Sequence, residues 1–177
     1  MLDIRSELLR SELQRPSATG LAMLVLAAAT ATILAALAFE HIGGYDPCAL
    51  CLQQRYAYYV GIPATVAALA LLLQVQPKAA AVVLLAVGVG FLVNAGLGVY
   101  QAGAEWKLWD PPSTCAAAAG LPTFDAGSLS IDRVPALCGV ASWRFLGLSF
   151  AGWNAVISAA LAGGALTAAL KAIRKPG

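Results

Sequence analysis

Four long stretches of the chain consist mostly of apolar residues and contain no charged residue. They are residues 20–39, 56–77, 79–104 and 145–170. Each has at least 20 residues, and an α-helix needs about 20 apolar residues to cross the hydrocarbon core of a bilayer. The pattern therefore predicts an all-α protein, an integral membrane four-helix bundle with one long extracytoplasmic loop.

The spacing of these stretches predicts a single membrane domain over residues 1–177. In order, we expect a cytoplasmic amphipathic arm (1–19), a first span (20–40), an outer loop (41–47), a second span (48–73), a cytoplasmic turn (74–78), a third span (79–100), a second outer loop (101–143), a fourth span (144–170) and a cytoplasmic tail (171–177). The arm mixes leucines with charges, which predicts either a helix on the membrane surface or a solvated basic segment. The first span is followed by three others, so we expect it to be retained rather than cleaved as a signal peptide.

Composition agrees with a lipid environment, and charge predicts an orientation. The chain is 60% apolar and 11% charged, with a mean hydropathy of +0.77, which is outside the usual range of soluble domains. Seven of its 11 Lys and Arg residues flank the side that holds both termini, and cytoplasmic loops are enriched in these residues. We therefore expect both termini in the cytoplasm. The net charge of +2 follows from this topology, and we expect no nucleic-acid partner.

All four cysteines fall on the outer side of this predicted topology. They are Cys48, Cys51, Cys115 and Cys138. Disulfides persist in oxidising compartments, so the cysteines could form two structural bridges, a zinc site or a redox relay. A C-x-x-C bridge closes too small a ring to stabilise a fold much, and the other two cysteines lack the paired spacing that zinc prefers. The spacing favours redox chemistry and predicts no metal site, although four cysteines allow three pairings.

The residues around the C-x-x-C strengthen the redox interpretation. Asp46 is a suitable N-cap and Pro47 a suitable first-turn residue, so the segment predicts a helix start that carries both cysteines. The positive end of a helix favours thiolate over thiol. Arg55 follows Cys51 by four positions and Cys48 by seven, which places all three on one helical face. Arg55 is either a membrane anchor or a donor to a thiolate or a quinone oxygen.

Polar and aromatic residues add two further expectations. Asn94 and Asn154 lie inside predicted spans, where amide side chains hydrogen-bond between helices. All five Tyr and all four Trp residues map to the outer half of the predicted topology. An interfacial aromatic belt explains such a distribution, and a flat aromatic ligand at the same surface is the alternative.

Three segments together resemble the DsbB family of disulfide bond formation proteins. Residues 47–55, Pro-Cys-Ala-Leu-Cys-Leu-Gln-Gln-Arg, resemble the family signature. The segment 100–109, which leads to Cys115, and the segment 143–149, which follows Cys138, are similar to family landmarks. The resemblance covers roughly residues 20–170.

The resemblance implies a quinone-dependent oxidant of a periplasmic thioredoxin-like protein, DsbA, in the bacterial inner membrane, with the cysteine loops in the periplasm. By this analogy the partner attacks Cys115, and Cys138 completes the loop pair. Cys48 and Cys51 then accept the electrons. Cys51, beside Arg55, passes them to ubiquinone or menaquinone.

One position departs from the family pattern. Many members have a histidine near the start of the second outer loop, where this chain has Gln101. An amide hydrogen-bonds but carries no proton charge near neutral pH. The resemblance makes Gln101 a candidate quinone neighbour.

Two other classes remain as alternatives. A vitamin K epoxide reductase-like oxidoreductase also combines loop cysteines, a C-x-x-C and a quinone, but there the loop cysteines come first in the chain, whereas here Cys48 and Cys51 do. A non-enzymatic membrane scaffold would use the cysteines for two stable bridges. Its cysteines would resist exchange with a thioredoxin-like protein.

Overall fold

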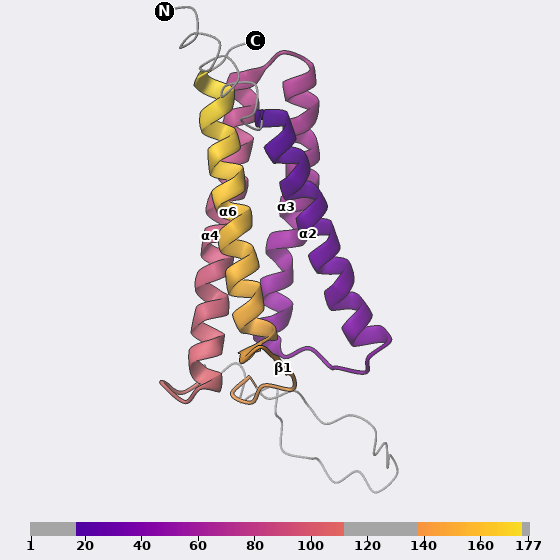
Figure 1. Ribbon diagram of the computed structural model, residues 1–177, viewed down its shortest axis with the longest axis vertical. Coiled ribbons are helices and arrows are strands. Elements are labelled where there is room, and N and C mark those ends of the chain that lie inside the picture. Colours follow the sequence, from indigo (N-terminus) through magenta and orange to yellow (C-terminus); the bar gives the residue numbers. More distant parts are fainter. Residues whose placement is uncertain (1–16, 112–137, 175–177) are drawn as a thin grey trace, which may run out of the picture.

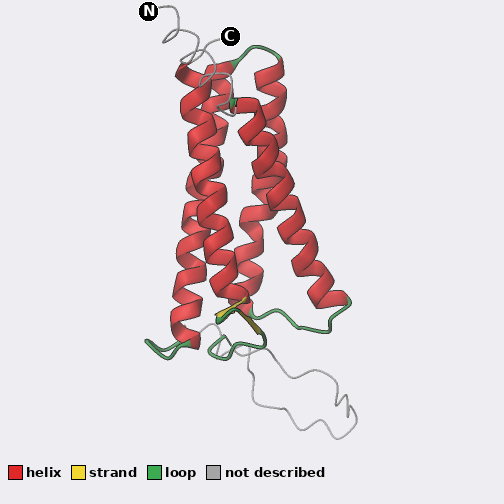
Figure 2. Ribbon diagram, in the orientation of Figure 1, coloured by secondary structure: helices red, strands yellow, loops and turns green. Residues whose placement is uncertain are grey.

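A bundle of helices standing side by side dominates the computed structural model, which describes residues 17–111 and 138–174 (Figure 1). Within these residues the elements are α2 (Ala18–His41), α3 (Ala49–Leu73), α4 (Pro77–Glu105), β1 (Arg144–Phe145), β2 (Leu148–Ser149) and α6 (Phe150–Arg174). The two short strands pair antiparallel at one end of the bundle (Figure 2). Residues 1–16 of the predicted amphipathic arm (1–19), Cys115 and the middle of the long loop lie outside the described residues, and the last two residues of that arm, Ala18 and Thr19, belong to α2.

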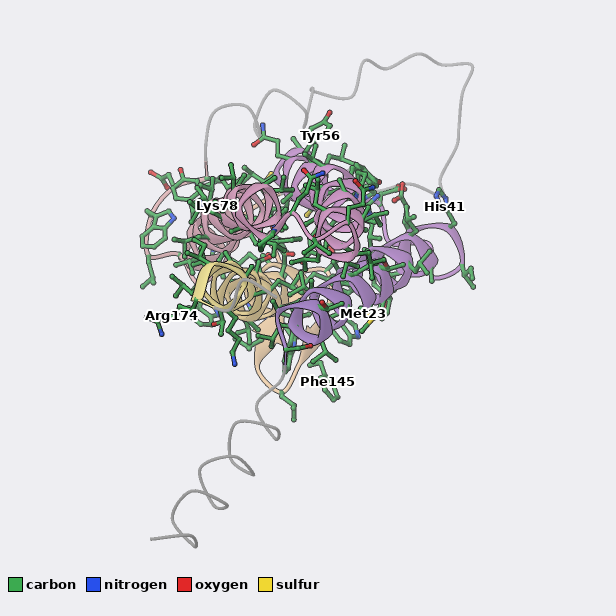
Figure 3. The ribbon with its side chains drawn as sticks, turned by 90° about the horizontal axis from the view of Figure 1, so that it is seen from above. Met23, His41, Tyr56, Lys78, Phe145 and Arg174 are labelled. Carbon is green, nitrogen blue, oxygen red and sulfur yellow. The ribbon has the colours of Figure 1, made fainter. Side chains whose placement is uncertain are left out.

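All four helices are long and apolar enough to cross a membrane. Many large apolar side chains on their outer faces are exposed, including Leu24, Val82 and Leu92. Met23 and Tyr56 also point away from the bundle (Figure 3). A water-facing surface of this kind would be unfavourable, whereas a lipid-facing one is expected. The structure confirms the predicted fold class, an all-α membrane bundle.

The helix ends follow local sequence, and the two largest differences from the expected limits are at the end of α4 and the start of α6. The backbone N–H of Gly20 donates to the Ser17 side chain at 3.0 Å, which caps α2, and Pro77 opens α4 in the first turn, where its missing N–H has no cost. Helix α4 continues to Glu105, past the expected limit at residue 100, because its last turn is buried against the bundle.

The second difference is at the start of the last helix. Residues 144–149 form the β hairpin instead of the first turn of a span. Leu146 and Gly147 both have positive φ, 51° and 84°, as the central residues of a two-residue hairpin turn require. Helix α6 therefore begins only at Phe150.

Small residues bring α4 and α6 together. A Cβ added at Gly98 would lie 2.9 Å from the carbonyl oxygen of Ala151, too close for any side chain. Close approach of this kind replaces the hydrophobic driving force that lipid does not provide. Gly90 and Gly96 of the same helix, by contrast, face open space. Helix α2 leans away from the other helices toward the hairpin end (Figure 1).

Candidate functional site

Cys48 forms the N-cap of α3, which corrects the prediction that Asp46 caps this helix. The backbone is still extended at Cys48, with φ −75° and ψ 168°. Its sulfur accepts the backbone N–H of Cys51 at 3.2 Å. Asp46 therefore lies two residues too early to reach the free N–H groups of the first turn. The first turn carries both cysteines, and its N–H groups favour negative charge on sulfur.

Gln101, in the penultimate turn of α4, connects the two cysteines. Cys48 and Cys51 are free thiols. The Nε2 amide of Gln101 donates to the Cys48 sulfur at 3.3 Å and to the Cys51 sulfur at 3.2 Å. Gln101 is only 3% exposed. The position named by family resemblance thus contacts both sulfurs of the C-x-x-C.

The Cys48 thiol holds its proton more tightly than a free cysteine does. The side-chain hydrogen bond with Cys51, and then burial, raise the pKa of the Cys48 thiol. These effects outweigh the opposite influence of the Cys51 backbone N–H and of Gln101. Cys48 therefore keeps its proton and donates it as a hydrogen bond toward Cys51.

A chain of side-chain hydrogen bonds extends from Gln101 into the bundle. Gln54 donates from Nε2 to the Gln101 Oε1 at 2.7 Å. Asn154 donates from Nδ2 to the Gln54 Oε1 at 2.6 Å, and the Tyr58 hydroxyl donates to the Asn154 Oδ1 at 2.7 Å. We call these four side chains the amide chain. They come from α3, α4 and α6, so the chain ties three helices together beneath the cysteines.

The predicted roles of the two membrane asparagines are confirmed. Asn154 of α6 bonds to Gln54 of α3, and Asn94 of α4 donates to the Ser158 hydroxyl of α6 at 2.9 Å. Buried amides are costly in lipid unless they are paired. These bonds therefore fix the mutual rotation of the helices around the site.

Cys138 lies against the C-x-x-C although it is far away in sequence. It is disulfide-bonded and only 3% exposed. Cys138 packs in one buried cluster with Cys48, Leu50 and Cys51. The structure thus brings three of the four predicted redox cysteines together, and the fourth, Cys115, lies outside the described residues. Thiol–disulfide exchange requires this kind of contact between pairs.

Arg55 lies two helical turns below Cys48, with most of its side chain buried. It forms an ion pair with Glu40, near the end of α2, and the two side chains are 12% and 22% exposed. Arginine at this depth requires a partner, and Glu40 provides one. Local sequence does not pair Glu40 with Arg55, because the contact joins two helices.

A cavity of about 550 Å³ opens beside these residues, where α2 leans away. Cys48, Cys51, Arg55 and Gln101 line one side of it. Residues of α2 and α6 form much of the rest of its wall, and they are mostly apolar. Sites for small molecules typically have this size and a few convergent polar groups. Arg55 therefore faces the same space as the two thiols, as the shared helical face predicts.

Aromatic rings surround the mouth of the cavity. Phe150 is at the centre, with ring centroids 5.0 Å from Phe39, 5.8 Å from Tyr45 and 4.8 Å from Trp143. All four residues line the cavity. The aromatic residues predicted near the outer surface thus include a cluster that forms a wall of the site. Stacked and edge-on rings of this kind suit a flat apolar ligand.

Glu105, the last residue of α4, is a cavity residue that the sequence analysis missed. It faces Ser149, Arg144 and Gln101, and no described residue hydrogen-bonds its buried Oε2. Glu105 directly follows the uncharged stretch 79–104, and this position could have indicated that it ends the helix. The third span was expected to end at residue 100, which placed Glu105 in the loop instead.

Comparisons with known proteins place the chain in a family. Residues 18–168 match the family model described as disulfide bond formation protein DsbB. The chain is 30% identical over 137 residues to disulfide bond formation protein B of Azoarcus sp. (strain BH72), an alignment that covers 73% of this chain and 79% of the relative. It is 33% identical over 135 residues to the protein of the same name from Marinobacter nauticus, covering 70% and 76%. No solved structure matches the chain at a significant level.

The matched region contains the four spanning helices almost completely, together with the cysteines and the cavity. The sequence resemblance is therefore confirmed. The chain belongs to the DsbB family, and it is a multi-pass membrane protein of disulfide bond formation.

Proposed function

We propose that this protein is a quinone-dependent thiol oxidase. It takes electrons from a reduced periplasmic thioredoxin-like protein of the DsbA type. The electrons pass through Cys115 and Cys138, then through Cys48 and Cys51, to a quinone in the membrane. The observation that carries the proposal is the cavity, because Cys51 and Arg55 line one largely apolar space and Cys51 packs against Cys138.

The residues of the cavity fit a quinone head group. Its walls are mostly apolar and aromatic, which suits a flat ring, and Arg55 offers N–H donors to a carbonyl oxygen. Ubiquinone and menaquinone share these features, and either would fit this description. When bound, the quinone supplies an acceptor for two electrons and two protons.

Two electrons and two protons pass from one cysteine pair to the next in each exchange. The thiolate of the reduced partner attacks Cys115 of the loop disulfide, and the partner leaves with a disulfide while Cys115 and Cys138 become thiols. These thiols then reduce a Cys48–Cys51 disulfide by the same exchange. Oxidation of the resulting Cys48 and Cys51 thiols releases two electrons and two protons to the acceptor. A DsbA-type partner is strongly oxidising, at about −120 mV, so the final acceptor needs a higher potential.

The proposed orientation places the cysteine end in the periplasm. The start of α2, the α3–α4 turn and the end of α6 lie at the opposite end of the bundle (Figure 1). That end carries Lys78, Lys171 and Arg174, as cytoplasmic ends usually do. We infer that the protein resides in the bacterial inner membrane with both termini in the cytoplasm.

Purified protein tests the proposal directly. With a reduced thioredoxin-like partner and ubiquinone, we expect catalytic reduction of the quinone, followed by its absorbance, with one partner disulfide formed per quinol. Omitting the partner should leave only background reduction. If the partner disulfide forms without quinol, quinone is not the acceptor. If neither the partner disulfide nor quinol forms, the proposed thiol–disulfide exchange is wrong.

A second prediction concerns the order of the loop cysteines. In a Cys138→Ser variant mixed with oxidised partner, the Cys115 thiolate attacks the partner's disulfide and no Cys138 remains to release it. We therefore expect a covalent adduct on non-reducing electrophoresis that disappears with reductant. Cys115→Ser is the matched control and should give no adduct. The assignment is wrong if the two variants behave in the opposite way.

A further inference from the structure

Gln101 directs its amide nitrogen at the two sulfurs. Its Nε2 carries two N–H groups, and the two bonds that it makes lead to Cys48 and Cys51 at 3.3 Å and 3.2 Å. Its oxygen accepts from Gln54. The Gln101 amide therefore bonds to the two sulfurs and to Gln54, and the Glu105 carboxyl also faces it.

The amide chain holds Gln101 in this orientation. The donors all run in one direction, from Tyr58 through Asn154 and Gln54 to Gln101. Turning the Gln101 amide around would place its Nε2 against the Nε2 of Gln54 and its oxygen against the sulfurs. Gln54, Gln101 and Tyr58 are at most 5% exposed, so water cannot readily replace a lost partner.

Two donated N–H groups favour the reduced state of a cysteine pair. With the proton held on Cys48, the thiolate of the reduced pair is at Cys51, and a thiolate accepts hydrogen bonds strongly, whereas a disulfide sulfur accepts them weakly. Stabilising the reduced form makes a dithiol pair more oxidising, as for strongly oxidising thioredoxin-like proteins. Such a pair can accept electrons from a partner that is itself strongly oxidising.

We propose that Gln101 is a positioning residue for the Cys48–Cys51 pair, stabilising its reduced form through an amide held in place by Gln54 and Asn154. The purpose of this effect rests on the proposed function, but the effect itself requires neither quinone nor partner. It assigns Gln101 to the cysteines rather than to the quinone. The chain thereby tunes how readily the C-x-x-C pair accepts electrons.

Equilibration of the purified full-length protein in glutathione redox buffers, without quinone or partner, tests this role. Alkylation and peptide mapping then give the oxidised fraction of Cys48 and Cys51. For Gln101→Met we expect the equilibrium to shift toward the disulfide by about tenfold, equivalent to about 30 mV. We also expect Cys51 in the reduced protein to be alkylated more slowly at a fixed pH.

The matched control is Gln53→Met, which makes the same change at an exposed position of α3. It should leave the equilibrium unchanged. Gln54→Met removes the residue that holds Gln101 and should shift the equilibrium in the same direction by less. If Gln101→Met does not fold, Gln54→Met decides the question by itself.

Equal equilibria for the buried variants and the control would overturn the proposal. A shift toward the reduced form would overturn it as well. Because no quinone is present, these outcomes are separate from failure of the proposed quinone reaction. A protein that shows the shift but does not reduce quinone would keep the role of Gln101 and lose the proposed acceptor.

Discussion

Cys51→Ser is expected to abolish quinone reduction, with turnover falling by about 1,000-fold or more. Serine cannot form a disulfide with Cys48, so the pair can neither accept electrons from the loop cysteines nor release them. The serine hydroxyl also remains protonated, so Gln101 would face a neutral oxygen in place of a reactive sulfur. The fold should persist, because the two side chains are nearly the same size. The measurement is steady-state quinone reduction with saturating reduced partner.

Thr167→Val is a suitable control for this variant. Thr167 is exposed on α6, and its hydroxyl bonds only to the Gly163 carbonyl of its own helix. The control should reduce quinone at the unaltered rate. Turnover by Cys51→Ser within tenfold of this control would show that electrons leave the protein by a route other than Cys51.

Arg55→Ala is expected to raise the KM for quinone by about 10- to 100-fold, since it removes a charge-assisted donor from the cavity. Exchange between the partner and the cysteines should continue, because Arg55 does not hydrogen-bond to Cys48 or Cys51 and pairs with Glu40 instead. The two measurements are the quinone dependence of turnover and the rate of partner oxidation in a single turnover without quinone.

A second variant separates ligand binding from anchoring. Arg55→Ala leaves the half-buried Glu40 carboxylate unpaired, which itself destabilises the bundle. The double variant Arg55→Ala with Glu40→Gln removes this unpaired charge, and we expect it to recover thermal stability but not quinone affinity. Recovery of both would show that Arg55 acts only as a structural anchor.

Much of the framework could be predicted from local sequence. The charge-free stretches identify four spans, because a helix that crosses lipid must satisfy its own backbone and cover itself with apolar side chains. The spacing of Cys48, Cys51 and Arg55 predicts a shared face, because α-helical geometry fixes the relation of positions four and seven apart. The cavity confirms that these three side chains face one space.

Local details were predicted less well where two signals compete. Asp46 and Pro47 together resemble a helix start, but the Cys48 sulfur takes the role of the cap. Residues 145–149 carry no charge and continue into the last span, yet the turn at Leu146 and Gly147 folds residues 144–149 into a hairpin. Hydrophobicity reports where a residue can lie, and backbone conformation decides which element it forms.

The sequence by itself determined the membrane class, the number of spans, the C-x-x-C with its arginine and the family. These features depend on composition and on spacing within one helix. Only the tertiary structure decided that Cys138 packs against Cys48, that Glu40 pairs with Arg55 and that Gln101 is held by Gln54. Each of these contacts joins segments far apart in sequence, and which side chains meet depends on how the helices rotate and tilt when their small residues pack.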